Sequence, residues 1–361
     1  MGSDNYFYGT TGDELYRITL NGNYTTLHTF TGGSDGSSPT GPIEATDGNL
    51  YGTATSTIYK FTRNGVYSVL YTFDPATSGS GAGALMQGSD GKLYVTASGG
   101  GAKGCGTVVK VALYGGLLAT HAFDCSAEGS TPVGPLTLTS DGNYYGVTKL
   151  GGTYGKGTLY QLTPEFGVTT LYNFGASPTD GIYPNGGLVL GTDGNLYGTT
   201  HSGDDYLFPT LFQWSLSSGY RQLHVFSPPD CNSVASSNCY WDISGGLMQH
   251  TNGLFYGSTG VVYVIGASAG PRGSLFSLDM GLGPFVALVR PHGKIGSNAQ
   301  ILGQGLIGTT AVTFNGIAAT SFNVVSDTYM TAVVPSGATT GPIVVTTPTH
   351  TLTSNRNFTV P

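Results

Sequence analysis

The chain of 361 residues is short of charge. Only 9% of its residues are Asp, Glu, Lys or Arg, with 13 basic against 20 acidic side chains and a formal net charge of −7. The basic residues form no cluster, which argues against a nucleic-acid surface. The low charge does not indicate disorder, because 39% of the residues are hydrophobic and aromatic residues are abundant, enough to bury a large core.

Long hydrophobic runs are also missing. No stretch approaches about 18 consecutive apolar residues, so the sequence predicts no membrane insertion. The first residues, Met1-Gly2-Ser3, lack the basic and apolar segments of a secretion signal. We expect any export signal to have been removed from this chain.

Cysteine is scarce as well. The chain has four cysteines, and none lies in a Cys-x-x-Cys metal-binding pattern. Cys105 and Cys125 flank a predicted hairpin, and Cys231 and Cys239 flank one loop. This arrangement predicts two local disulfides formed in an oxidising compartment, with free buried thiols as the alternative. It favours a secreted or cell-surface protein.

What the chain has in abundance is a repeated octapeptide. Six near-copies occur: NYFYGTT (5–11), DGNLYGTA (47–54), DGKLYVTA (90–97), DGNYYGVT (141–148), DGNLYGTT (193–200) and NGLFYGST (252–259). Successive copies are 43, 43, 51, 52 and 59 residues apart, measured at Gly9, Gly52, Val95, Gly146, Gly198 and Gly257. Self-similarity at this spacing is typical of propellers, solenoids and other arrays.

Each repeat has the pattern of four antiparallel strands. In the clearest copy, GGLVLGT from Gly186 is an apolar strand, DGN is a two-residue hairpin turn, and LYGTT is a second strand. Segments such as GTLYQLT (157–163) and VTTLYNF (168–174) supply the third and fourth strands. One such sheet cannot bury both of its faces. We therefore predict an all-β fold, a β-propeller of about six four-stranded blades, with a linear solenoid as the alternative.

The aspartates of the repeat occupy the first position of the predicted turn. They are Asp47, Asp90, Asp141 and Asp193. We expect them to tolerate a left-handed backbone beside the glycine that follows. The alternative is calcium binding, but each copy supplies one carboxylate and no second acid at ligand spacing. The octapeptide is therefore predicted to be a structural unit.

The pattern resembles a known family. G-L-x-x-x-x-D-G-N-L-Y-G-T-T, followed by G-T-L-Y-x-L-T-P-x-x-G and T-T-L-Y-x-F, is similar to the GloVer tandem repeat of bacterial surface and secreted proteins. The resemblance covers residues 5–282 and implies no catalytic residues, because the family is defined by its repeat. The first copy begins at Tyr6 with the second strand of a unit. The first strand of blade one is thus missing, and VVYVIGA at 261–267 is our candidate to complete it.

The repeat ends near residue 282. From Asn298 onward, short β-like segments follow at regular spacing, as in a small β-sandwich. G-x-G-L, V-T-F-N-G-I-A-A, V-P-S-G-A-T-T-G-P-I-V-V-T-T and S-N-x-x-F-T-V resemble an IPT/TIG domain, an immunoglobulin-like fold. We therefore expect a propeller of residues 1–282 and a sandwich of residues 283–361, for which the resemblance implies a spacer or adhesion role. DNA binding is a poor analogy, because the fixed cations are only Arg290, Lys294 and Arg356.

Binding residues are expected on the longer loops opposite the DGN turns, since loops mounted on a rigid scaffold carry specificity. These loops are rich in aromatic rings for stacking on sugars and in groups that can fix hydroxyls. For Trp241, packing against a neighbouring blade is the alternative. The predicted ligand-binding residues are Tyr154, Lys156, Tyr183, His201, Tyr206, Tyr240 and Trp241.

Catalysis or metal binding would use the acids of the same loops. An enzyme of this type needs carboxylates that converge near one channel mouth. His201 with Asp204 and Asp205 also has metal-ligand chemistry, with a solvated polar turn as the alternative. The candidate catalytic carboxylates are Asp180, Asp204, Asp205 and Asp242, followed by Glu128.

Three histidines occur at one position of the repeat. His28, His121 and His224 stand where Tyr71 and Tyr172 stand in other copies. We therefore interpret these histidines as structural rings rather than as a catalytic triad.

Together, these patterns favour a secreted or cell-surface module that binds a polysaccharide or cell-surface glycan, with the sandwich as a spacer. A propeller glycoside hydrolase or polysaccharide lyase is the first alternative, because propellers host both binding and catalysis. A self-associating adhesive repeat is the second. No cofactor is predicted, a structural or site metal ion being the alternative, and neither nucleic acid nor a membrane is an expected partner.

Overall fold

A computed structural model describes residues 2, 4–177, 180–201, 208–226, 239–240, 243, 246–259, 263–264 and 274–360. For residues 239–240, 263–264 and 274 it describes the backbone alone. Regular structure in this part of the chain consists of strands, with no helix. The all-β prediction is therefore confirmed, and the described residues hold no helix that could span a membrane.

Six sheets of three or four strands follow one another along the described repeat region, and each is a meander of antiparallel neighbours. A further two-stranded sheet pairs β20 (Cys239–Tyr240) with β23 (Tyr263–Val264), which lies between β22 and β24 in the chain. Sheets one to three contain β1 (Phe7–Thr11), β2 (Glu14–Ile18) and β3 (Tyr24–Thr29); β4 (Ile43–Glu44), β5 (Leu50–Ala54), β6 (Thr57–Phe61) and β7 (Tyr67–Thr72); and β8 (Ser80–Gln87), β9 (Leu93–Gly99), β10 (Thr107–Val111) and β11 (Leu117–Ala122). Sheets four to six contain β12 (Ser130–Leu138), β13 (Tyr144–Leu150), β14 (Thr158–Leu162) and β15 (Val168–Asn173); β16 (Ile182–Leu190), β17 (Leu196–His201), β18 (Thr210–Ser215) and β19 (Gly219–Val225); and β21 (Met248–Gln249), β22 (Phe255–Thr259) and β24 (Ser274–Leu278).

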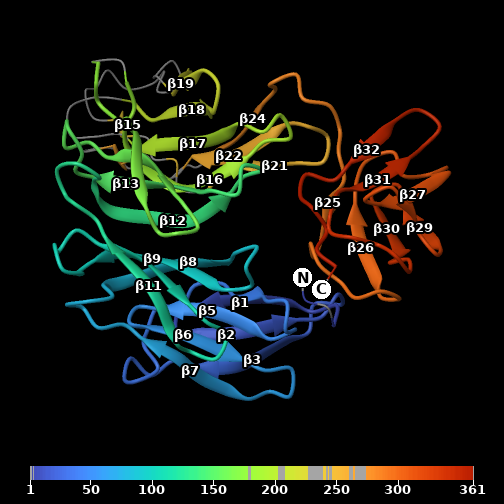
Figure 1. The fold of residues 1–361 in the computed structure, drawn as a ribbon, viewed down its shortest axis with the longest axis horizontal. Coiled ribbons are helices and arrows are strands. Elements are labelled where there is room, and N and C mark those ends of the chain that lie inside the picture. Colours follow the sequence, from blue (N-terminus) through green and yellow to red (C-terminus); the bar gives the residue numbers. More distant parts are fainter. Residues whose placement is uncertain are drawn as a thin grey trace.

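The sheets succeed one another in chain order, with sheets one to three on one side of the molecule and sheets four to six on the other (Figure 1). Neighbouring sheets contact each other through their first two strands, as β5 does with β8, β9 with β12 and β13 with β16. Sheets two to five have the four strands that the sequence predicts.

The glycine of the octapeptide makes room for an aromatic ring on the next strand. A Cβ on Gly52 would overlap with the ring of Tyr59, which lies opposite it in the register. The same clash arises between four further pairs: Gly9 and Tyr16, Gly146 and Tyr160, Gly198 and Phe212, and Gly257 and Phe276. In sheet three Val95 replaces the glycine and faces the smaller Val109. The space between these two strands is therefore filled either by an aromatic ring opposite a glycine or by two valines. This explains why Val95 is the one residue that departs from glycine at this position of the octapeptide.

The DGN turn is a three-residue loop, so the predicted two-residue hairpin is wrong. In sheet two the Gly48 N–H donates to the Ala45 carbonyl (2.9 Å), and the Ala45 N–H donates to the Asn49 carbonyl (2.9 Å). Gly48 adopts a φ of 81°, whereas Asp47 does not have a positive φ. The left-handed residue is thus the glycine that closes the loop, as in hairpins with a bulge. The prediction that the aspartates tolerate this conformation is corrected accordingly.

The aspartate instead links the turn to the core. Asp47 accepts the Asn49 N–H through Oδ1 (3.0 Å) and the Tyr51 hydroxyl through Oδ2 (2.7 Å). We call this arrangement the turn latch. It recurs between Asp90 and Tyr94 (3.1 Å), Asp141 and Tyr145 (2.7 Å), and Asp193 and Tyr197 (2.7 Å). In sheet six asparagine replaces the aspartate and the direction is reversed, because Asn252 Nδ2 donates to the Tyr256 hydroxyl (3.1 Å). The tyrosine rings of the four aspartate latches are buried.

A sixth turn latch lies in sheet one, where the sequence pattern does not show it. Asp4 accepts the Tyr8 hydroxyl (2.5 Å), and Asn5 holds the left-handed position with a φ of 64°. Asparagine tolerates this conformation better than most residues, because its side chain is short and polar. The repeat therefore extends to the first described residues.

The C-terminal module, residues 285–360, consists of two four-stranded sheets. Their strand orders are β25 (Ala287–Leu288), β26 (Asn298–Leu302), β30 (Tyr329–Val333), β29 (Phe322–Ser326), and β28 (Ile317–Ala318), β27 (Ala311–Phe314), β31 (Ile343–Thr346), β32 (Thr351–Thr353). Ile301 and Met330 of the first sheet and Phe314 and Val345 of the second share one buried core. The module therefore has a hydrophobic core of its own.

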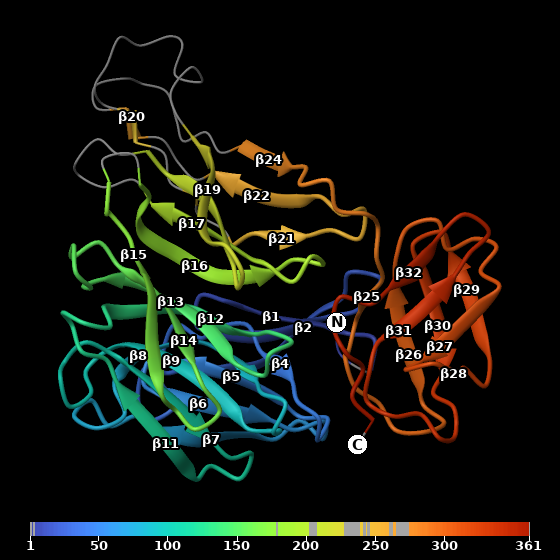
Figure 2. The ribbon, with the colours of Figure 1, turned by 45° about the horizontal axis from the view of Figure 1, so that its top comes forward.

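The module touches both ends of the repeat region (Figure 2). Gln304 donates to Thr251 in the turn of sheet six (3.2 Å), and Gln300 donates to Asn5 in the turn of sheet one (3.1 Å). Arg290 lies 3.6 Å from Glu44 of sheet two, whose side chain is only 7% exposed. These contacts connect the first sheets of the series with the last.

The candidate for completing blade one is not supported where it can be checked. Of the segment 261–267, the structure describes Tyr263 and Val264, which form β23. These residues pair with β20 (Cys239–Tyr240) and not with β1. The described part of the chain therefore leaves sheet one with three strands.

The turn latch of Asp141 gives a test by mutation and pH. Burial alone would raise the pKa of the Asp141 carboxyl, but hydrogen bonds from Thr139, Asn143 and Tyr145 outweigh it and lower this pKa to about 2. Asp141→Ala should lower the free energy of unfolding at pH 7 by about 1 to 3 kcal/mol, since it removes a charged acceptor from several donors.

A depressed carboxyl pKa stabilises the fold above the unfolded value and loses that effect as the pH falls through the folded value. The deficit of Asp141→Ala should therefore shrink between about pH 4 and pH 2, as measured by chemical denaturation. Glu165→Ala is the matched control, because Glu165 is exposed in the same sheet. Equal stability losses in the two variants would contradict the latch.

Candidate functional site

The end of the sheets opposite the turn latches is held by a second recurring device. After the fourth strand, an acid or serine followed by glycine accepts backbone N–H groups of its own loop. Asp35 accepts from Thr31 (3.0 Å), Glu128 from Asp124 (2.8 Å) and Asp180 from Gly175 (2.9 Å). Ser78 does the same for Asp74 (2.8 Å). Asp180, a predicted catalytic carboxylate, is thus a loop cap, and it is 5% exposed.

The histidines of the fourth strands contact these caps. His28 Nε2 lies 3.2 Å from Asp35, and His121 Nε2 lies 2.9 Å from Glu128. The Tyr172 hydroxyl donates to Asp180 in the same way (2.8 Å). Burial, followed by the hydrogen bond to Asp180, raises the pKa of Tyr172 well above its usual value. The two histidines therefore occupy the structural position of a tyrosine, as their place in the repeat indicates.

Ring contacts are equivalent at the same position. His28 stacks on Tyr67 with ring centroids 3.5 Å apart, and Tyr172 stacks on Tyr220 at 4.0 Å. His224 meets Phe226 edge to face at 4.8 Å. The three histidines lie in separate sheets and form no triad.

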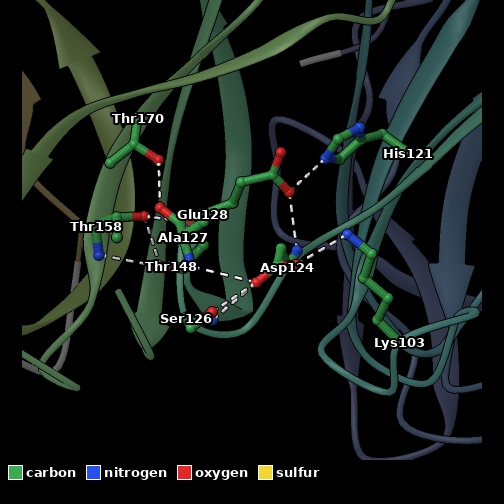
Figure 3. A network of polar contacts seen from close by, with 9 residues as sticks. All are labelled: Lys103, His121, Asp124, Ser126, Ala127, Glu128, Thr148, Thr158 and Thr170. Carbon is green, nitrogen blue, oxygen red and sulfur yellow. Dashed lines mark hydrogen bonds and ion pairs between the residues drawn. The ribbon is translucent and has the colours of Figure 1, made fainter. Parts of the chain in front are cut away.

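Figure 3 shows how the crossover between sheets three and four is fixed. Asp124 accepts from Ser126 Oγ (2.9 Å) and from Lys103 (3.1 Å), and these bonds lower the pKa of its carboxyl. The Glu128 carbonyl accepts the Thr158 hydroxyl (2.8 Å), so the loop is bonded to the neighbouring sheet.

A disulfide joins the same loops. Cys105 and Cys125 are bonded, with their Cα atoms 5.5 Å apart, which confirms that predicted pair. The bond connects the β9–β10 loop to the loop after β11. The other predicted pair falls outside the described residues, since Cys231 is not described and Cys239 is described by its backbone alone.

Lys156 takes the place of Cys105 in the next sheet. Gly100 forms a bridge with Cys105, and Gly151 forms the equivalent bridge with Lys156. The Lys156 ammonium lies 3.1 Å from the Tyr183 hydroxyl and 5.0 Å from the centre of its ring. A covalent clamp in sheet three therefore corresponds to a Lys–Tyr contact between sheets four and five.

Tyr183 has an unusual backbone. Its φ is 55°, and the equivalent residues Ser38, Gly81 and Thr131 also have positive φ. Its N–H donates to the Lys156 carbonyl (2.9 Å), as that of Thr131 does to the Cys105 carbonyl (3.0 Å). The fold requires a left-handed residue here, and a bulky side chain in that conformation costs energy.

Four of the predicted ligand-binding residues lie at one end of sheets four and five. Tyr154 is 50% exposed on the β13–β14 loop that also carries Lys156. His201 ends β17 opposite Ile182, the neighbour of Tyr183. We call Tyr154, Lys156, Tyr183 and His201 the loop cluster. Sequence reasoning missed the exchange of Cys105 for Lys156, although aligning GGAKGCGT (100–107) with GGTYGKGT (151–158) reveals it.

The structure describes no side chain for the predicted site residues beyond position 201. Tyr240 is described only by its backbone, in β20. Among the described residues no group of three or more His, Cys, Asp or Glu side chains could hold a metal ion. The remaining predicted site residues fall outside the described part of the chain. They are the catalytic candidates Asp204, Asp205 and Asp242, of which the first two are also metal candidates, and the ligand-binding candidates Tyr206 and Trp241.

The disulfide gives a second prediction. The Cys105–Cys125 bond closes a loop of 20 residues, for which its removal should cost about 3 kcal/mol of unfolding free energy. Chemical denaturation of a Cys105→Ser/Cys125→Ser variant, with and without reductant, measures this. Reductant should destabilise the parent protein by at least this amount, and the variant only by whatever the predicted Cys231–Cys239 bond contributes. An unchanged parent would show that the bond is not formed or does not stabilise the fold.

Several solved structures are similar to this chain. A luciferin-regenerating enzyme shares 13% identity over 78% of this chain and 89% of its own (TM-score 0.47). PorZ, a bacterial surface component of the type-IX secretion system of Porphyromonas gingivalis, shares 14% over 100% of this chain and 50% of its own (0.49). A gluconolactonase from Xanthomonas campestris shares 13% over 91% and 98% (0.43). The chain thus spans half the length of PorZ, and likenesses this distant indicate no function.

No curated protein matches the sequence. The sequence profile of the Gloeobacter/Verrucomicrobia repeat matches residues 54–262. The match supports the GloVer resemblance over that range and does not extend to the C-terminal module. Because it covers more than half of the chain, the protein belongs to the Gloeobacter/Verrucomicrobia repeat family.

Proposed function

We propose that this protein is a secreted or cell-surface module that binds a polysaccharide through the loop cluster. The observation that carries the proposal is Tyr183, which keeps a bulky side chain at φ 55° and directs its hydroxyl to Lys156 (3.1 Å). A glycine fits this position without strain, as Gly81 does in sheet three. Ser38 and Thr131 share this backbone conformation, so what distinguishes sheet five is the large phenol held there beside the Lys156 ammonium.

The chemistry of the loop cluster suits a sugar. Tyr154 offers a half-exposed ring face on which a pyranose can stack. Lys156, Tyr183 and His201 offer donors that can fix hydroxyl or carboxylate groups. Binding sites commonly combine an apolar platform with a few polar groups in this way.

The finer architecture is part of the proposal. We infer that the six sheets form a closed β-propeller, which the contacts between consecutive sheets support. The two sheets of the C-terminal module, which share one core, support an IPT/TIG-like sandwich that acts as a spacer. The Cys105–Cys125 disulfide supports an extracellular location, because such bonds persist in oxidising compartments.

Retention on immobilised plant and microbial polysaccharides tests the function. Tyr154→Ala and Lys156→Ala should each weaken retention by about tenfold or more, equivalent to about 1.4 kcal/mol. Tyr114→Ala is the matched control, because Tyr114 is 80% exposed on the β10–β11 turn at the opposite end of the sheets. Its retention should equal that of the parent. Equal losses in all three variants, or no retention of the parent on any polymer, would refute the proposal.

A polysaccharide lyase is the second candidate, favoured by the Lys156–Tyr183 contact of 3.1 Å. In such an elimination, a base removes the proton beside the carboxylate of a uronic acid, the C–O bond to the leaving sugar breaks, and an acid protonates the leaving oxygen, so that a free hydroxyl and an unsaturated sugar result. A hydrolase would need two carboxylates flanking the bond. Asp180, the described acid nearest in sequence to Tyr183, is buried as a loop cap.

Ultraviolet absorbance of unsaturated ends, recorded during incubation with uronic-acid polymers, separates the two candidates. A lyase should raise the absorbance, and Tyr183→Phe should abolish that rise while keeping retention. Retention of the parent without any absorbance change would exclude the lyase for these polymers and favour the binding module.

A further inference from the structure

Sheet one lacks a strand that the other five sheets have. In sheets two to six, the first strand of the sheet, which we call the inner strand, pairs with the strand of the octapeptide. The pairs are β4 with β5, β8 with β9, β12 with β13, β16 with β17 and β21 with β22. In sheet one the octapeptide strand is β1, and it pairs only with β2 in the described part of the chain. One edge of β1 therefore corresponds to an edge that is covered in every other copy.

Burial shows the effect of the missing strand. All residues of β5 are buried, as are the octapeptide residues of β9, β13 and β17. In β1 no residue is buried, and Phe7 is 47% exposed although its equivalent Leu50 is 3% exposed. An uncovered strand presents unpaired backbone N–H and C=O groups that favour pairing with another strand.

Sheet one is otherwise built like its neighbours. Gly9 faces the ring of Tyr16, and Asp4 forms the turn latch with Tyr8. The C-terminal module forms a hydrogen bond with this turn, where Gln300 Nε2 donates to Asn5 Oδ1. No described hydrogen bond from the module reaches the backbone of β1. The surface that would receive an inner strand is thus formed, and no strand among the described residues covers it.

The other sheets specify what fits there. Three of these inner strands, β8, β12 and β16, contain the pattern Gly-x-Leu, as Gly83–Leu85, Gly134–Leu136 and Gly186–Leu188. The same pattern precedes β21 in the sequence as Gly245–Leu247, whereas sheet two has isoleucine in place of the leucine (GPI, 41–43). The leucines are buried, from 5% exposed for Leu85 to 7% for Leu247. Gly134 lies so close to the backbone of Gly186 and Gly187 that a Cβ would overlap with it. The leucine fills the space beside the octapeptide strand, and the glycine lets neighbouring inner strands approach.

We propose that the edge of β1 is a binding site for an extended segment with the Gly-x-Leu pattern, supplied by a further repeat of the same family. The segment adds antiparallel to β1, in the register that β16 adopts on β17, and completes the sheet by strand addition. This site is separate from the loop cluster and does not depend on polysaccharide binding.

Hydrogen exchange with a synthetic peptide tests the site. The probe has the sequence of residues 184–192, PNGGLVLGT, and the control peptide has proline at the position of Val189, which removes a backbone donor and is not tolerated inside a sheet. In the full chain, the probe should slow amide exchange in Phe7–Thr11 at least tenfold and leave β17 unchanged. The control peptide should have no effect.

Three results would overturn the proposal. Exchange in β1 that the probe does not slow would show that the edge binds no such strand. Equal protection by the proline peptide would show that backbone pairing is not involved. Protection of β17 instead of β1 would show exchange with the native inner strand.

Discussion

The turn latch is the interaction on which the repeat depends. One carboxylate accepts the backbone N–H of the residue two positions later, just after the turn glycine, and the hydroxyl of a tyrosine four positions later. A turn on the surface is thereby fixed to a ring in the core, so the local hairpin and the packing of the sheet specify the same register. In four of the six copies, the aspartate of the latch belongs to an Asp-Gly turn of nearly constant sequence.

The two ends of each sheet follow different rules. The latch end tolerates little change, since the turn, the glycine opposite an aromatic ring and the tyrosine depend on one another. The opposite end keeps the loop cap and its ring partner but varies the residues around them. At one equivalent position sheet three has a disulfide cysteine and sheet four has Lys156. Binding surfaces are commonly built from loops whose residues vary while the strands that hold them stay the same. We therefore assign the proposed function to the loop cluster.

Much of the fold follows from the sequence. Four-strand units, their boundaries and the Cys105–Cys125 bond can be read from apolar alternation, turn residues and spacing. The octapeptide predicts where the turn lies but not its length, because Asp-Gly serves both two-residue and three-residue loops. The latch of Asp4 escapes the pattern since Asn5 replaces the glycine.

The site is less predictable than the fold. Asp180 reads as an exposed loop acid, and its role as a cap becomes visible only when Tyr172, from the preceding strand, is seen to contact it. The contact of Lys156 with Tyr183 joins two sheets and has no signal in either repeat alone. Contacts between successive repeats depend on how the sheets are packed, and composition or periodicity cannot supply that.

The central claim is that the octapeptide is structural and that function lies at the other end of the sheets. The most direct test replaces the latch tyrosine with phenylalanine in separate copies, Tyr51→Phe, Tyr145→Phe and Tyr197→Phe, and measures unfolding and polysaccharide retention on the same samples. We expect each variant to lose about 1 kcal/mol of unfolding free energy and to keep the retention of the parent. Loss of retention in one variant without a loss of stability would contradict the account.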